Sequence, residues 1–117
     1  MNNKIIIISS PSGAGKTTIC KNLIKKLKKI DISVSYTTRQ KRKNEINGKD
    51  YYFIDKKDFL ELKKKKFFVE TAKVFDNYYG SPKSNITNSF NKKHHVLFDI
   101  DWQGAKKLRK IYKKKLI

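Results

Sequence analysis

The chain has 117 residues, enough for one domain and too few for two of ordinary size, and its formal net charge is +19. Only three of its 29 basic residues are arginines, and the rest are lysines in scattered clusters, which is typical of solvated lysine-rich surfaces. A surface that reads nucleic-acid bases is expected to use the planar arginine fork, so we expect no dedicated nucleic-acid binding.

The first predicted element is a strand over residues 4–9, because a run of four isoleucines is typical of a strand buried on both faces. This run is too short for a signal-peptide core, and no apolar run reaches the length of a membrane span. The single cysteine, Cys20, cannot form an internal disulfide, which fits a reducing cytoplasm. We therefore expect a cytoplasmic protein without a membrane segment.

Helices and short strands alternate along the rest of the chain. The pattern predicts a helix over 17–29, a strand over 32–37, a polar loop over 39–50, an extended segment over 51–54 and a helix over 56–65. It then predicts a strand over 67–75, a turn at 77–80, a helix over 83–91 after Pro82, a strand over 95–101 and a helix over 103–114.

This alternation predicts an α/β fold with a parallel central sheet flanked by helices. The stretch 36–81 mixes short strands and polar loops, so we expect it to be a mixed α/β insertion. The core of this single domain would then be residues 1–35 and 82–117. A core of about three parallel strands would be small and would leave a sheet edge unpaired.

The stretch SPSGAGKTT, residues 10–18, lies between the first predicted strand and the first predicted helix, where a phosphate-binding P-loop is expected. Small residues let backbone N–H groups approach a phosphate, the helix N-terminus favours the anion, and Lys16 can reach the β- and γ-phosphates. The pattern's first glycine is replaced by Ser10, and an ordinary strand–helix turn is the alternative. The predicted ATP-binding residues are Ser10, Pro11, Ser12, Gly13, Ala14, Gly15, Lys16, Thr17 and Thr18.

A P-loop binds its nucleotide with Mg²⁺, and two residues are candidate metal ligands. Thr17 supplies a hydroxyl, and Asp99 follows an apolar run that brings its carboxylate to the carboxyl edge of the sheet. Asp101 lies two residues further on and should point the same way if the strand continues. It could instead cap the helix that begins near Gln103.

Three further stretches resemble the successive signatures of guanylate kinases: SVSYTTRQKRKNEINGKDYYF (33–53), FFVETAKVFDNYYGSP (67–82) and LFDIDWQGAKKLRK (97–110). With the P-loop they follow the family's order and cover nearly the whole chain. The resemblance implies a P-loop NTPase-type core, with the insertion over 36–81 as a GMP-binding subdomain. It also implies transfer of the γ-phosphoryl group of ATP, with Mg²⁺, to GMP or dGMP, giving ADP and GDP or dGDP as precursors of GTP and dGTP.

The resemblance assigns roles to individual residues. Arg39 and Arg42 match a pair that grips the GMP phosphate, and Tyr51 and Tyr79 would add hydroxyl donors. Glu70 matches the guanine reader, because a carboxylate accepts from N1–H and the 2-amino group, whereas adenine presents an acceptor at N1. The expected catalytic residues are Lys16, Arg39 and Arg42. The expected GMP-binding residues are Ser35, Arg39, Arg42, Glu45, Tyr51, Glu70, Tyr79, Ser81 and Asp101.

The chain departs from the family pattern in two respects. The family commonly has Pro where Lys41 stands and Gly where Asn44 stands, so we expect a less rigid loop. It also commonly has an aromatic residue where Thr71 stands, after the position of Glu70. Family members are longer, so the resemblance implies that a lid and the last core strands are missing from these 117 residues. Two alternatives stay open: a guanylate-kinase-like binding module without catalysis, and another P-loop kinase with a different base specificity. The oligomeric state is not predicted.

Overall fold

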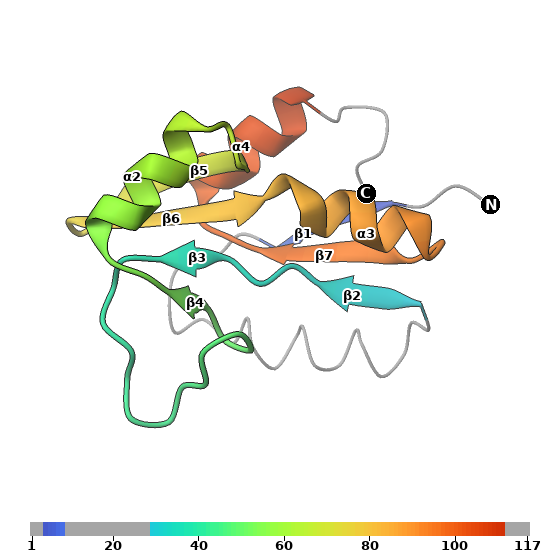
Figure 1. Cartoon of the computed structure of the whole chain (residues 1–117). Coiled ribbons are helices and arrows are strands. Elements are labelled where there is room, and N and C mark those ends of the chain that lie inside the picture. Colours follow the sequence, from blue (N-terminus) through green and yellow to red (C-terminus); the bar gives the residue numbers. More distant parts are fainter. Residues whose placement is uncertain (1–3, 9–28, 112–117) are drawn as a thin grey trace. The chain divides into compact units, whose positions relative to one another are not determined.

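The structure is a computed structural model that describes residues 4–8 and 29–111 (Figure 1). Two compact units make it up, one within Met1–Ser33 and Ser84–Ile117 and the other within Val34–Lys83. The predicted helix over 17–29 falls outside the described residues except for its last residue. Within the described ranges, no helix is both long enough and apolar enough to cross a membrane.

The first unit is built on a parallel sheet of three strands in the order β1 (Ile5–Ile8), β7 (His95–Asp99) and β2 (Ile30–Ile32). The middle of the central strand β7, Val96 to Phe98, is fully buried, as expected for a parallel strand covered on both faces. The register places Ile8, at the end of β1, opposite Asp99, at the end of β7. The predicted parallel core of three strands is therefore confirmed.

Two helices belong to this unit. One is α4 (Trp102–Ile111), and the other is α3 (Lys83–Asn91), of which only the first residue belongs to the second unit. α4 buries Gly104, Ala105 and Leu108, which form one stripe of the helix. α3 ends where Lys93 adopts a left-handed backbone conformation (φ 59°), which lets the N–H of His94 donate to the carbonyl oxygen of Ser89 at 2.8 Å. Both helices match the predicted segments, apart from residues 112–114, which lie outside the described ranges.

The second unit is a sheet of four strands in the order β4 (Tyr52–Phe53), β3 (Tyr36–Thr37), β6 (Asn77–Pro82) and β5 (Phe68–Val74), with helix α2 (Lys56–Lys64). β3 and β4 run parallel, and the other pairs are antiparallel. The Asp55 carboxylate caps α2 by accepting the N–H of Asp58 at 2.8 Å. The helix anchors to the sheet through Phe59, whose ring stacks on Phe68 at 4.7 Å between centroids.

Two predicted elements were wrong. Residues 32–37 form the end of β2 and all of β3, which lie in different sheets, because Ser33 N–H still bonds to the core strand β7 while Tyr36 pairs with Gly80 of β6. The segment 77–80 belongs to strand β6, and the turn is Phe75–Asp76, where both residues have positive φ, 48° and 66°. A two-residue hairpin loop of this type requires positive φ at both positions, which Asn and Gly adopt most readily. The two residues of this loop are neither Asn nor Gly, so their types did not indicate a turn at this position.

Candidate functional site

The predicted phosphate loop, residues 10–18, lies outside the described residues, so its predicted ATP-binding residues stay a prediction. The strand that leads to it in the sequence is described. β1 lies beside β7 with Ile8 opposite Asp99, and both strands end at the same edge of the parallel sheet. Ligands of open α/β sheets bind outside the carboxyl ends of the strands. The edge where Asp99 lies is therefore the edge at which a nucleotide would bind.

Asp99 is half-buried at the end of β7, as the sequence predicts. A single carboxylate at this edge fits Mg²⁺, because this ion usually keeps several waters and binds through one or two protein oxygens plus substrate phosphates. Across residues 4–8 and 29–111, no three His, Cys, Asp or Glu side chains group to form a metal cage. The second candidate ligand, Thr17, lies outside the described residues.

Asp101 caps helix α4. Its Oδ1 accepts the N–H of Gly104 at 3.2 Å, its Oδ2 accepts a hydrogen bond from the Gln103 amide at 3.2 Å, and its carbonyl oxygen accepts the N–H of Ala105. Strand β7 ends at Asp99, two residues before the predicted end. The helix-capping role, which the sequence left open, is therefore what the structure shows for Asp101. Its contact with GMP stays a prediction.

The loop between β3 and β4 contains an ion pair with two parallel hydrogen bonds. The Arg39 guanidinium donates to Glu45 through Nη1 to Oε1 at 3.0 Å and Nη2 to Oε2 at 2.8 Å. Both side chains are partly buried, with 15% and 18% of their surfaces exposed. Such fork-to-fork pairs combine charge with a fixed geometry. The pair therefore fixes the guanidinium in one position of the predicted GMP-binding loop.

Aromatic rings surround the same guanidinium. The Arg39 Cζ atom lies 5.3 Å from the ring centre of Tyr51 and 5.8 Å from that of Phe53. The Tyr51 ring contacts the Tyr79 ring at 5.9 Å between centroids. Hydrogen bonding to Glu45 is the main effect that raises the pKa of Arg39, and Tyr79 adds to it. The structure thus brings together Arg39, Glu45, Tyr51 and Tyr79, all predicted GMP-binding residues.

Arg42 contributes differently to this loop. Its backbone N–H donates to Glu45 Oε1 at 2.8 Å, whereas its side chain is exposed and makes no hydrogen bond within the part of the chain that the structure describes. The bonds from Arg39 and from the Arg42 backbone lower the pKa of Glu45 to about 2 against the opposing effect of burial. Glu45 is therefore ionised at neutral pH, and the two arginines of the predicted pair have unequal surroundings.

A second group of predicted residues is buried in the sheet of the same unit. Glu70 of β5 and Ser81 of β6 are cross-strand partners, and the Ser81 hydroxyl donates to Glu70 Oε1 at 2.6 Å. The Ser35 hydroxyl, just before β3, lies 3.3 Å from the Ser81 hydroxyl. Glu70 is 6% exposed and is the only ionisable side chain among the buried residues that the structure describes. Buried polar groups need hydrogen-bond partners, and Ser81 provides one for Glu70.

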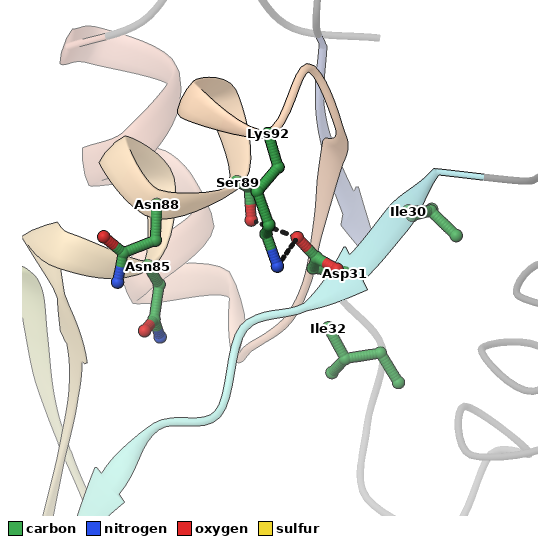
Figure 2. A pocket seen from close by; sticks show the side chains of 7 residues that line it. All are labelled: Ile30, Asp31, Ile32, Asn85, Asn88, Ser89 and Lys92. Carbon is green, nitrogen blue, oxygen red and sulfur yellow. Dashed lines mark hydrogen bonds and ion pairs between the residues drawn. The ribbon is translucent and has the colours of Figure 1, made fainter.

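The structure also shows a polar hollow of about 400 Å³ in the first unit, which we had not predicted (Figure 2). Figure 2 shows Asp31 of β2 turned toward Ser89 and Lys92, from α3 and the turn after it; Ser89 donates at 2.9 Å and Lys92 lies at 3.2 Å. His94 Nδ1 lies 3.1 Å from the same carboxylate. Burial, the largest single effect, raises the pKa of Asp31, but the hydrogen bonds from His94, Ser89 and Lys92 outweigh it and leave the pKa below its ordinary value. Because these residues are scattered in the sequence without a motif, no sequence signal marked this cluster.

Known proteins that are similar to this chain belong to one family. The sequence model of the family described as guanylate kinase matches residues 2–117. A guanylate kinase of Rickettsia bellii (strain RML369-C) is 50% identical over 105 residues, which are 90% of this chain and 55% of the relative. A guanylate kinase of Wolbachia sp. subsp. Brugia malayi (strain TRS) is 48% identical over 113 residues, which are 97% of this chain and 58% of the relative.

A solved structure agrees. The crystal structure of guanylate kinase from Anaplasma phagocytophilum superposes with a TM-score of 0.83 and 37% identity, over 99% of this chain and 57% of that chain. The chain spans about half the length of the curated relatives that it matches. The family match covers nearly every residue, and the parallel core and the predicted motifs agree with it, so the chain belongs to the guanylate kinase family.

Proposed function

We propose that this chain takes part in the guanylate kinase reaction, in which the γ-phosphoryl group of ATP passes to GMP or dGMP. The single observation that carries the proposal is the buried series of hydrogen bonds that links Ser35, Ser81 and Glu70. It presents a carboxylate, which can accept from two adjacent donors at once, in the same unit as a fixed guanidinium. Guanine offers such a pair of donors, and the phosphate of GMP needs such a cation.

The acceptor nucleotide would bind in the second unit. Arg39, Arg42, Tyr51 and Tyr79 would hold its phosphate, because cationic forks and hydroxyl donors offset the charge of the dianion as a second phosphate approaches. On the base side, Glu70 would accept from N1–H and the 2-amino group. The remaining base-side contacts in this unit would come from Ser35 and Ser81, and Glu45 would belong to the same loop as the two arginines. The base contact of Asp101, a residue of the first unit, stays a prediction from the family resemblance.

The donor nucleotide would bind at the carboxyl edge of the parallel sheet. Ser10 to Thr18 would surround the phosphates of ATP, and Lys16 would donate to its β- and γ-phosphates. Thr17 and Asp99 would hold Mg²⁺, which, when bound, neutralises charge on the phosphates. Phosphoryl transfer depends mainly on such positioning and charge neutralisation. The binding partners of the chain would be these nucleotides. The reaction would take place in the cytoplasm, as a step in the supply of GTP and dGTP.

The test is GMP-dependent release of ADP from MgATP by the purified chain, with Lys16→Ala alongside and AMP as the competing acceptor. We expect turnover with GMP, little with AMP and none in the Lys16→Ala variant, because the variant lacks the cation that reaches the transferred phosphate. Binding of GMP without release of ADP would identify a binding module instead. Equal turnover with AMP would contradict the assigned base specificity.

A further inference from the structure

We propose that Glu45 is a positioning residue, which acts through Arg39 to hold the phosphate side of the acceptor site in its binding geometry. This inference rests on the proposed function of the same site. Glu45 collects three N–H groups: Nη1 and Nη2 of Arg39 and the backbone N–H of Arg42, at 3.0, 2.8 and 2.8 Å. One carboxylate thus orients the side chain of one arginine and the backbone of the other.

The arrangement argues against a direct contact between Glu45 and the phosphate of GMP. An ionised carboxylate can only accept hydrogen bonds, and a phosphate dianion offers further acceptors and further negative charge. Three donors already fill much of the accepting capacity of Glu45. Its effect on the phosphate would therefore pass through the cation that it holds.

Further hydrogen bonds within the loop hold the backbone next to this carboxylate. The backbone N–H of Glu45 donates to the carbonyl oxygen of Arg42 at 3.1 Å, and the Lys41 ammonium donates to the carbonyl oxygen of Glu45 at 3.1 Å. The Arg39 guanidinium also lies over the Tyr51 ring and donates to the carbonyl oxygen of Gln40 at 3.0 Å. These contacts within the protein hold the loop in one geometry, and preorganisation of this kind raises affinity because less freedom is lost on binding.

The two arginines then have different tasks. The Nη groups of Arg39 are engaged with Glu45 and Gln40, so this residue would supply a fixed positive charge beside Tyr51 and Tyr79. The Arg42 side chain is exposed and makes no hydrogen bond to any residue of the described ranges, so its fork can turn to the phosphate. The backbone bond from Arg42 to Glu45 would place the base of that side chain correctly.

The experiment measures calorimetric binding of GMP and of guanosine, which lacks the phosphate, to the whole chain without ATP. The variants are Glu45→Gln, which keeps the shape and removes the charge, and Glu45→Asp, which keeps the charge on a shorter side chain. The matched control is Glu61→Gln, an exposed acid on α2. The thermal unfolding midpoint of each variant is measured to check that the variant is folded. If Glu45→Gln does not fold, Glu45→Asp alone is compared with wild type.

We expect Glu45→Gln to weaken GMP binding by about 10- to 150-fold, the range for lost bonds to a charged group, and to change guanosine binding by less than about twofold. Glu45→Asp should lie between wild type and Glu45→Gln, and Glu61→Gln should match wild type. An equal loss for GMP and guanosine would overturn the proposal, because Glu45 would then contact the nucleoside or merely fold the loop. Unchanged GMP binding would overturn it as well.

A second measurement does not depend on nucleotide binding. With only three arginines in the chain, the guanidinium NMR signal of Arg39 can be assigned by its absence in Arg39→Lys. We expect a distinct, slowly exchanging signal in wild type that is lost in Glu45→Gln and kept in Glu61→Gln. If wild type bound no GMP, the proposed function would fail, whereas this signal would still decide whether Glu45 positions Arg39. An unaltered signal in Glu45→Gln would refute the positioning role.

Discussion

Replacing Glu70 by Gln tests the proposed base-recognition role of this residue most directly. Glu70 is buried, and the 2.6 Å bond from the Ser81 hydroxyl to its Oε1 lies within the range of hydroxyl–carboxylate bonds. In the variant, the amide oxygen can still accept from Ser81. The amide NH₂ group would then take the place of the second carboxylate oxygen, and it would meet a donor of guanine where an acceptor is required.

The magnitude follows from the loss of this acceptor. A hydrogen bond to a charged group contributes about 1.5–3 kcal/mol, so GMP binding should weaken by about 10- to 150-fold. The fold should tolerate the change, because the variant removes a buried charge and keeps the volume of the side chain. We therefore expect the loss to appear in nucleotide affinity and not in the unfolding midpoint.

The assay compares calorimetric binding of GMP, IMP and AMP to wild type and Glu70→Gln. IMP keeps N1–H but lacks the 2-amino group, so the ratio of GMP to IMP affinity reports the contact with that group. In wild type we expect the order GMP, IMP, AMP, and in the variant we expect the three affinities to converge. If Glu70→Gln kept both the affinity for GMP and the preference over IMP and AMP, Glu70 would not be the base reader and the assignment would be refuted.

Three further predictions concern stability. A Cβ atom added at Gly80 would lie 2.8 Å from the ring of Phe68, which is itself stacked on Phe59, so Gly80→Ala should destabilise the chain by about 1–3 kcal/mol in urea unfolding; an unchanged midpoint would show that the ring moves aside freely. Asp101→Ala should cost about 0.5–2 kcal/mol in the same assay, because it removes the cap of α4, and Asp101→Asn should restore most of this; equal losses in both variants would argue against capping. The pKa of Asp31 is lowered in the folded state, so its contribution to stability is present above its ordinary pKa of 3.8 and is lost as the pH falls through the folded pKa. The gap in unfolding free energy between wild type and Asp31→Asn should therefore shrink as the pH falls below 3.8, and a gap that kept the same size from pH 5 to below pH 3.8 would contradict this.

Much of the fold could be predicted because local patterns decide it. Isoleucine runs and the apolar run before Asp99 specify buried strands, and helical spacing marked α2, α3 and α4 within a few residues. The hairpin was missed because its positive-φ loop falls on Phe75 and Asp76, whereas turn-forming residues follow it in the sequence. The division of 32–37 between two sheets was missed because alternation shows which residues form strands but not which strand will pair with them.

The sequence by itself determined the family and the order of the core elements, because these depend on motifs and on the local period of apolar residues, and it predicts the residue types of the acceptor site. Only the tertiary structure decided how the site residues share their hydrogen bonds. Arg39 pairs with Glu45, Glu70 bonds to Ser81, and Asp101 caps its own helix. The partner of a charged side chain depends on which strands and loops fold beside it, and Glu70 and Ser81 meet because strands β5 and β6 place them opposite each other in the sheet.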